Sequence, residues 1–306
     1  MTKKTVITYL KGIPNAKNKE KIDVLKFFAE GVTKYGDLGV ASEQRRWSKS
    51  HAGVIQGFVH SSSPNSPHLK LRREVIDKQI ANRRHAIIID SNLFLYADPG
   101  NSNHYLRYSS NGVFPTTGNY FWDDPDPNRW KSISQTLKLS LKDWRTKGNH
   151  IVICLQRNGG WSMQGLDVMS WCKNVIARIQ AVTDRPIVVR AHPGDKRAVQ
   201  YLKLNYPNVK TSFTPNITDD LKDAWCVITY NSSPGVAAAI EGIPVFVLDT
   251  NAENSQAFEI ANTKLKKIEN PLMPDRQQWI EKISMSHWNF KELRSGEAWA
   301  HIRKYI

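Results

Sequence analysis

The second half of the chain alternates short apolar runs with longer segments of helical periodicity, and this alternation constrains the fold more than any other feature of the sequence. A continuously apolar run is typical of a strand buried on both faces, and parallel strands are joined by crossovers that are usually helical. The predicted strands are Ile151–Leu155, Ile187–Ala191, Val209–Ser212, Cys226–Tyr230 and Val245–Leu248, and the predicted helices are Val168–Val182, Lys196–Leu204 and Pro234–Glu241. The pattern predicts an α/β fold with a parallel sheet covered on both faces.

The first half follows the same logic less regularly. The predicted strands are Thr5–Leu10, Gly53–Val59 and Ala86–Asp90, and the predicted helices are Lys21–Tyr35, Leu71–Ile80 and Leu137–Trp144. The segment 91–128 is rich in Asn, Asp, Gly, Pro and aromatic residues, which favours a functional loop region. Because 306 residues exceed what one hydrophobic core usually supports, we predict two Rossmann-like domains that meet near the turn at 146–149. The tail 277–306 is expected to be helical, with Trp279, Trp288 and Trp299 as packing residues.

Apolar runs and cysteines exclude several classes of protein. No apolar run approaches the roughly 20 residues that a membrane-spanning helix needs, and the first residues do not resemble a signal peptide. The three cysteines, Cys154, Cys172 and Cys226, are odd in number and lie in apolar runs. They argue against a disulfide framework and a cysteine-based zinc site, and they indicate a reducing compartment, so a cytoplasmic location is expected.

Positive charge is concentrated in the first half of the chain. The whole chain has 43 basic and 28 acidic residues, a net charge of +15, and residues 1–150 hold 24 of the basic and 13 of the acidic residues. A basic surface is typical of proteins that bind polyanions, above all nucleic acid, although a solvated lysine-rich face remains an alternative. The candidate residues are Arg45, Arg46, Lys49, Lys70, Arg72, Arg73, Arg83 and Arg84.

Polar and glycine-rich segments follow three of the predicted strands in the second half. In open parallel sheets, ligands bind beyond the carboxyl ends of the strands. The segment after Tyr230 offers serine hydroxyls and backbone amides at the start of a helix, which favours an anion, although helix capping alone would explain it. His192 before a proline could equally be a turn residue. Together these loops predict a phosphate-bearing ligand, with Arg157, Gly159, Gly160, Arg190, His192, Ser232, Ser233 and Gly235 as candidate contacts.

The motifs RAHP at 190–193 and NSSPGVAAAIEGIPVFVLD at 231–249 resemble the donor half of GT-B glycosyltransferases, in particular the capsule and sialyl types with His-Pro and Ser-Ser motifs. The resemblance implies two Rossmann-like domains facing a central cleft. It implies an acceptor domain at 1–148, a nucleotide-sugar domain at 149–285, and a helix at 286–306 that packs back on the first domain. It further implies that His192, Ser232 and Ser233 hold the donor phosphate, and that Glu241 approaches the sugar or ribose hydroxyls.

The segments QRNGGWSMQG and SHWNFKELRSGEAWAHIRKYI are similar to glycosyltransferase-type proteins of tailed phages. Some phage enzymes of the GT-B type glycosylate hydroxymethylated pyrimidines, such as hydroxymethylcytosine, in duplex DNA. The resemblance therefore implies a hexosyl- or pentosyltransferase that acts on modified double-stranded DNA in the host cytoplasm. The basic first half would supply contacts to the phosphates.

The donor expected from this resemblance is a UDP-sugar, with a CMP-sugar as the alternative, and no metal or other cofactor is required. Arg157 and Arg190 would stabilise the leaving phosphate. Asp90, at the end of a buried strand, is our candidate for the general base, although it could simply cap a turn. An Asp-x-Asp pattern at 124–126 lies in a proline-containing turn, which favours a loop over a metal site.

Two alternatives to a DNA glycosyltransferase stay open. One is a glycosyltransferase of a bacterial capsule or surface polysaccharide, which would keep the donor site and change the acceptor. The other is a non-catalytic nucleic-acid-binding protein with a GT-B-like scaffold, because a fold does not by itself establish an activity. The oligomeric state is not predicted.

Overall fold

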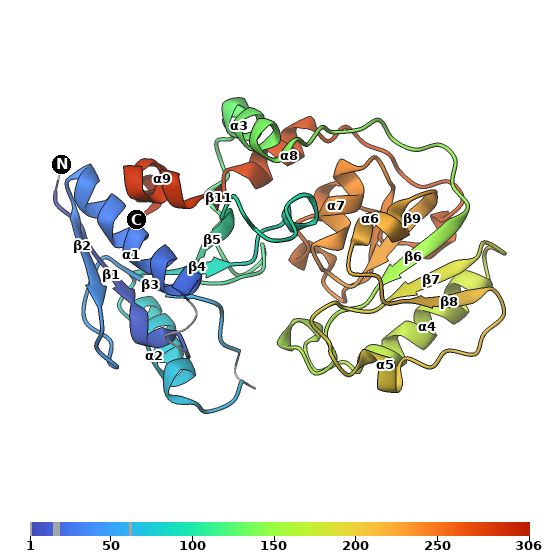
Figure 1. The fold of residues 1–306 in the computed structure, drawn as a ribbon, viewed down its shortest axis with the longest axis horizontal. Helices are drawn as coiled ribbons and strands as arrows, with labels where there is room; N and C mark the ends of the chain where they lie inside the picture. Colours follow the sequence, from blue (N-terminus) through green and yellow to red (C-terminus); the bar gives the residue numbers. More distant parts are fainter. Residues whose placement is uncertain (1, 15–18, 61–62) are drawn as a thin grey trace. The chain divides into compact units, whose positions relative to one another are not determined.

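The computed structural model describes residues 2–14, 19–60 and 63–306, and the chain forms two compact units (Figure 1). Unit 1 comprises Met1–Asn92, Gly100–Lys131 and Glu281–Ile306, and unit 2 comprises Leu93–Pro99 and Ser132–Ile280. These limits differ from the predicted boundary at 148/149. Residues before that boundary join unit 2 because the Lys142 and Arg145 amides donate to the carbonyls of Ile240 and Gly242.

Unit 1 contains a six-stranded sheet in the order β11-β5-β4-β3-β1-β2. Its strands are β1 (Thr5–Tyr9), β2 (Leu38–Ser42), β3 (Ala52–Gln56), β4 (His85–Asp90), β5 (Leu106–Ser110) and β11 (His287–Trp288). β1 to β4 are parallel, and β5 is antiparallel to both of its neighbours. Helices α1 (Lys19–Tyr35) and α2 (Pro67–Ala81) cover opposite faces of the sheet, as Figure 1 shows.

The end of the chain packs on α1 through α9 (Phe290–Ser295) and α10 (Glu297–Ile302). Close approach at this contact needs glycine, since a Cβ at Gly31 would lie 1.8 Å from the carbonyl oxygen of Leu293. Trp299 donates its indole N–H to Asp37 Oδ2 at 2.8 Å, and the Arg303 guanidinium pairs with the same carboxylate. The three tail tryptophans are all buried, as the sequence predicted.

Unit 2 contains a five-stranded, fully parallel sheet in the order β10-β9-β6-β7-β8. Its strands are β6 (His150–Cys154), β7 (Ile187–Arg190), β8 (Val209–Ser212), β9 (Ala224–Thr229) and β10 (Val245–Val247). Its helices are α4 (Val168–Gln180), α5 (Ala198–Tyr201), α6 (Ile217–Leu221) and α7 (Pro234–Ile240), while α3 (Pro127–Leu137) and α8 (Gln277–Ser284) each run from one unit into the other. Short 3-10 turns occupy Leu10–Gly12, Leu95–Ala97, Trp161–Met163, Ala252–Asn254, Phe258–Ile260, Leu265–Lys267 and Arg303–Tyr305.

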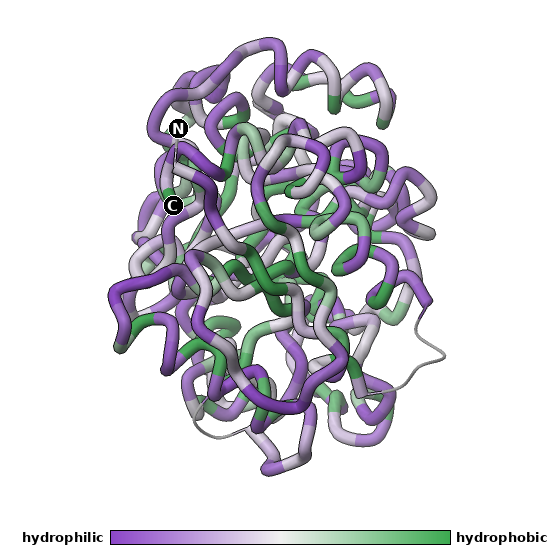
Figure 2. Tube along the Cα trace, turned by 90° about the vertical axis from the view of Figure 1, so that its left-hand side faces the viewer, coloured by the Kyte–Doolittle hydropathy of each residue, from purple (hydrophilic) through white to green (hydrophobic). Residues whose placement is uncertain are grey.

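The predicted α/β class with two Rossmann-like units is confirmed. Hydrophobic and hydrophilic stretches alternate along the chain (Figure 2), and the central strands of both sheets contribute buried apolar residues to the two cores. All three cysteines are buried and free. Within the described ranges, no helix is long and apolar enough to cross a membrane.

Several predicted elements are wrong in extent or type. The predicted helix at Leu137–Trp144 is not formed. The helix in this region, α3, precedes that range and ends at Leu137, because Lys138 adopts a positive φ of 55°. The helix predicted at Lys196–Leu204 shrinks to the four residues of α5. Strands β2, β5 and β11 were missed, and β5 interrupts the loop predicted at 91–128. β2 is largely exposed, β11 has only two residues, and β5 is rich in polar residues, so their apolar periodicity is weak.

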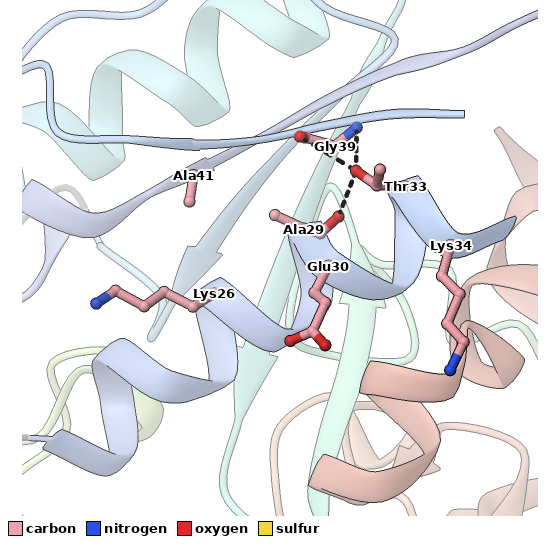
Figure 3. A pocket seen from close by; sticks show the side chains of 7 residues that line it. All are labelled: Lys26, Ala29, Glu30, Thr33, Lys34, Gly39 and Ala41. Carbon is pink, nitrogen blue, oxygen red and sulfur yellow. Dashed lines mark hydrogen bonds between the residues drawn. The ribbon is translucent and has the colours of Figure 1, made fainter. Parts of the chain in front are cut away.

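Helix α1 packs beside the outer strand β2 and partly covers it. The Thr33 hydroxyl donates to the carbonyl oxygen of Ala29 and accepts from the amide of Gly39, which leaves an open hollow between helix and strand (Figure 3). A Cβ at Gly39 would lie 2.0 Å from Ala29 O, so only glycine permits this approach. The side-chain bond occupies a strand-edge donor that would otherwise be free to pair with another chain.

Candidate functional site

The carboxyl ends of all five strands in unit 2 lie at one edge of the sheet, because the strands are parallel. Gln156 follows β6, His192 follows β7, and Asn231 and Ser232 follow β9. Asp249 follows β10 at the same edge. The loops in which the sequence predicted a site therefore lie at one edge of the sheet in this unit.

A buried hydrogen-bond network joins three of these loops. Gln156 Nε2 donates to Asn231 Oδ1 at 2.7 Å and to the Ser162 hydroxyl at 2.9 Å. Asn231 Nδ2 donates to Asp249 Oδ2 at 2.6 Å, and Asn254 Nδ2 donates to the same oxygen at 3.2 Å. Four of these side chains, those of Gln156, Asn231, Asp249 and Asn254, are at most 8% exposed. The network fixes the loops after β6, β9 and β10 relative to one another.

This network was not among the residues predicted for the site. Gln156, Asn231 and Asp249 each follow directly, or one residue after, an apolar run that predicts a strand. Their position after a predicted strand was the signal that could have identified them, but it was used to predict the loops and not these individual side chains. Buried polar residues at strand ends are informative because an amide or carboxylate is costly to bury without partners.

Several polar atoms at this edge have no hydrogen-bond partner among the described residues. They are Gln156 Oε1, Thr229 Oγ1 and Ser232 Oγ, all of which are enclosed. Unsatisfied buried polar atoms are rare in native proteins and need a reason such as a bound ligand or water. Their concentration at one edge is consistent with a ligand that completes the site.

His192 is poised as a neutral hydrogen-bond donor. Its Nδ1 accepts from the amide of Gly194 at 2.9 Å, which places the ring proton on Nε2. Burial and the nearby charge of Arg157 lower the pKa of His192, so the ring is neutral near pH 7. Asp195 holds the same loop in place, since it accepts from the amide of Asn158 at 3.0 Å and from the Tyr201 hydroxyl at 2.6 Å.

Arg157 and the two glycines that follow lie in the loop after β6. The Arg157 side chain is exposed and forms no ion pair with any described residue. Gly159 has a φ of +69°, and a Cβ there would meet nothing, so backbone conformation rather than space favours glycine. At Gly160 a Cβ would lie 2.9 Å from the carbonyl oxygen of Arg157.

The start of α7 differs from the free anion cradle that we expected. The amides of Gly235, Val236 and Ala237 already donate to the carbonyls of Ser232 and Ser233. This happens because Ser233 itself has helical backbone angles, φ −55° and ψ −26°, so the first turn closes on its own residues. What remains for a ligand is the exposed Ser233 side chain and the unpartnered Ser232 hydroxyl, while Gly235 packs against Val245 of β10.

Arg190 and Glu241 do not lie free in the site. The Arg190 guanidinium is 4% exposed, pairs with Asp220 at 2.5 Å, and donates to Thr214 Oγ1 and to two backbone carbonyls. Its donors are used inside the protein, which argues against the predicted phosphate contact. Glu241 ends α7 at the opposite edge of the sheet, where it accepts from Tyr96 and pairs with Lys142. A contact between Glu241 and a donor sugar is therefore not supported.

In unit 1, Asp90 stands at the carboxyl end of β4. Its Oδ2 accepts from Arg107 at 2.7 Å, and its Oδ1 accepts from the amide of Ser91 at 2.8 Å. Arg107 lies directly opposite Asp90 in the β4–β5 ladder and stacks over Tyr120, so its position is fixed. The Asp90 side chain keeps 28% exposure, which leaves the carboxylate reachable from solvent.

The eight predicted DNA contacts do not form one patch. Arg83 and Arg84 lie between α2 and β4, at the amino edge of the sheet, because α2 runs antiparallel to the strands. Lys70 and Arg73 lie in the half of α2 nearer the carboxyl edge, and Arg45, Arg46 and Lys49 are exposed in the segment between β2 and β3. Arg72 is buried, so it is not part of any exposed basic surface.

Acidic residues in the described ranges do not assemble a metal site, since no three His, Cys, Asp or Glu side chains come together there. Asp126 of the Asp-x-Asp pattern instead accepts from the amide of Asn128 at 2.9 Å at the start of α3.

The protein is similar to known proteins in structure but not in sequence. No protein-family model and no curated protein sequence matches the chain. The structure is similar to a beta Kdo 2,4 transferase, KpsC of Thermosulfurimonas dismutans, with a TM-score of 0.59 and 13% identity over 92% of this chain and 90% of that one. It also matches the beta Kdo 2,7 transferase of the same KpsC (TM-score 0.48, 12% identity, 99% and 100% covered). A Methanocaldococcus jannaschii UDP-GlcNAc 2-epimerase matches more distantly, with a TM-score of 0.34 and 11% identity, each chain fully covered.

At these identities the similarity establishes the architecture alone. Two Rossmann-like units of this topology, with the end of the chain returning to the first, constitute the GT-B fold.

Proposed function

We propose that the protein is a glycosyltransferase that binds a nucleotide-sugar at the carboxyl edge of the unit 2 sheet. One observation carries the proposal: the loops after β6, β7 and β9 present a free Arg157, a neutral His192 and an unpartnered Ser232 hydroxyl at one edge. Hydrogen-bond donors and a cation at strand ends suit the phosphate of a nucleotide. The GT-B fold, and the transferase activity of the similar Kdo enzyme, support this class of reaction.

The proposed reaction moves one glycosyl group. The acceptor oxygen attacks the anomeric carbon while the bond from that carbon to the donor phosphate oxygen breaks. The hydroxyl proton passes to a carboxylate base, for which Asp90 stays our candidate, and the nucleotide leaves with the additional negative charge. His192 Nε2–H and Arg157 stabilise this charge where it develops, which is where preorganised donors accelerate a reaction most. Arg107 holds Asp90 in one orientation.

The donor in this proposal is a UDP-sugar, with a CMP-sugar as the alternative. The His-Pro and Ser-Ser motifs do not separate the two, because in this proposal they contact the phosphate and not the base. Titration calorimetry with UDP and CMP separates the two, since a base-specific site binds one of them more tightly.

For the acceptor, an acidic surface polysaccharide fits the structure better than duplex DNA. The net charge of +15 supports a polyanionic partner of either kind. A DNA site needs exposed cations along one face, and the predicted residues are divided between two edges of the sheet, with Arg72 buried. Glycosylation of hydroxymethylated DNA is kept as the second candidate because of the exposed cations Arg45, Arg46 and Lys49.

The test combines the purified protein with a panel of UDP- and CMP-sugars and two kinds of acceptor. Acidic oligosaccharides and hydroxymethylcytosine or hydroxymethyluracil duplexes are each analysed by mass spectrometry for a gain of one sugar. A mass gain on the oligosaccharide that is lost in His192→Ala is the expected result. A gain on DNA would move the acceptor to the second candidate, and no binding of any nucleotide would refute the transferase proposal.

A further inference from the structure

Arg72 of α2 is a buried cation with no anionic partner among the residues that the structure describes. Its side chain is 8% exposed, and its Nε donates to the carbonyl oxygen of Gly12 at 2.7 Å. No described carboxylate lies within ion-pair distance of it. Every other arginine of the described ranges that is this deeply buried, namely Arg107, Arg129, Arg190 and Arg276, either pairs with an acid or donates to at least two carbonyls.

The isolation of this charge has an energetic consequence. A buried charge is costly unless it is paired, and removal of solvent lowers the pKa of the Arg72 guanidinium to about 10. No neighbouring acid offsets that effect. The nearby His68 adds no second positive charge, because burial and Arg72 lower the pKa of the ring, and an imidazole cannot supply a negative one. Such an arrangement is expected where an external anion completes the site.

The guanidinium lies at the carboxyl edge of the unit 1 sheet. It packs against Gly12, after β1, and against Gly57, after β3. A Cβ at Gly57 would lie 2.7 Å from Nη1, and Gly57 has a φ of +88°, so both space and backbone favour glycine there. The terminal nitrogens Nη1 and Nη2 make no hydrogen bond to described residues and are not among the enclosed polar atoms, so they reach solvent.

Arg72 and Asp90 belong to the same edge of the unit 1 sheet. The amide of Gly57 donates to the carbonyl oxygen of Ile89 at 2.7 Å, and Ile89 directly precedes Asp90. Adjacent strands are about 4.8 Å apart, so the Arg72 nitrogens and the Asp90 carboxylate belong to neighbouring positions on one edge. One sugar residue can present an anionic group to the first and a hydroxyl to the second.

We propose that Arg72 binds a single anionic group, a carboxylate or a phosphate, on the acceptor of the proposed transferase. The terminal nitrogens form the planar fork that suits bidentate binding of such a group. The site takes one group on a small sugar acid rather than a duplex backbone, because DNA phosphates are contacted by exposed side chains and this guanidinium is recessed. The inference rests on the proposed function for the identity of the acceptor, and the anion site itself can be tested separately.

The test measures binding of D-glucuronate and inorganic phosphate by calorimetry at constant ionic strength, with glucose as the neutral counterpart. Arg72→Met removes the fork, and Lys78→Met removes one charge from the exposed face of the same helix as the matched control. The wild type and Lys78→Met are expected to bind both anions and not glucose. Arg72→Met is expected to lose about tenfold or more in affinity, the effect of removing a charged hydrogen-bonded contact.

Arg72→Lys serves as a second variant in case Arg72→Met does not fold. It keeps the charge without the fork and is expected to bind the anions more weakly than the wild type. Equal affinity in Arg72→Met and the wild type, equal losses in Arg72→Met and Lys78→Met, or tighter binding of duplex DNA through Arg72 than of either small anion would overturn the inference.

Nucleotide binding in the same experiments separates the two proposals. If glucuronate or phosphate binds through Arg72 and neither UDP nor CMP binds, the anion site stands and the transferase proposal fails. If a nucleotide binds and neither small anion does, the transferase proposal stands and the anion site fails.

Discussion

The side-chain network at the edge of the unit 2 sheet gives the sharpest prediction for stability. Asp249 accepts hydrogen bonds on both carboxylate oxygens: from Asn231 and Asn254 on Oδ2, and from the Asn251 amide and the Thr250 hydroxyl on Oδ1. In Asp249→Asn only one oxygen can accept. Whichever way the new amide is turned, two donors lose their acceptor and face an NH₂ group.

The magnitude follows from the number of bonds lost. A hydrogen bond to a charged group contributes about 1.5–3 kcal/mol, so losing two should lower the free energy of unfolding by roughly 3–6 kcal/mol. The reciprocal variant, Asn231→Asp with Asp249→Asn, restores an acceptor opposite the new amide and another for Gln156 Nε2. It should recover a substantial part of the loss, because the central donor–acceptor pairs are again matched.

Urea-induced unfolding followed by circular dichroism measures both variants. Glu269→Gln is the matched control, since its partner Arg185 precedes β7 at the other edge of the same sheet and the pair is partly exposed. The control should lose at most about 1 kcal/mol. An Asp249→Asn protein as stable as the wild type, or a double variant less stable than Asp249→Asn, would show that the network does not fix these loops.

Three further predictions concern other buried groups. Arg190→Met leaves Asp220 buried without its cation, so the free energy of unfolding should fall by about 3–5 kcal/mol. Nucleotide affinity, measured by calorimetry, should stay within about twofold of the wild type. A large loss of affinity without a loss of stability would restore Arg190 to the donor site. Burial lowers the pKa of His287 to about 3, below its value in the unfolded chain, so in acid the unfolded state takes up a proton that the folded state does not. The free energy of unfolding should therefore fall by up to about 1.4 kcal/mol per pH unit as the pH drops from 6 towards 3. His287→Gln should flatten this slope, and an unchanged slope would contradict the assignment. Burial raises the pKa of the Cys154 and Cys172 thiols to about 12 and also raises that of Cys226, so a thiol reagent at pH 8 should label none of the three in the folded protein and all three in denaturant.

The architecture of unit 2 could be predicted from the sequence because its strands are apolar on both faces. Runs such as Ile151–Leu155 are unlike anything in a loop or surface helix, and the observed strands begin and end within two residues of the predicted limits. Strands with exposed or polar residues gave no such signal. β2 exposes Leu38 and Val40 at the edge of the sheet, and β5 carries Arg107 and three hydroxylated residues.

The candidate site could be located by its loops but not resolved into individual roles. That His192 lies beyond β7 follows from its position after an apolar run. Arg190, by contrast, contacts Asp220 and backbone carbonyls of the segment 214–216. Its orientation depends on how that segment folds, which no local sequence pattern specifies. Arg72 shows the same difficulty, because a basic helix residue predicts exposure until the packing of Gly12 and Gly57 over it is known.

Binding of nucleotides to the wild type and to His192→Ala tests the central claim most directly. The neutral ring has its proton on Nε2 and, among the described residues, makes a single local hydrogen bond. We therefore expect UDP or CMP to bind the wild type and to bind His192→Ala about tenfold or more weakly, with the midpoint of unfolding unchanged. Absence of binding to the wild type, or equal affinity in the variant, would contradict a donor site at this edge of the sheet.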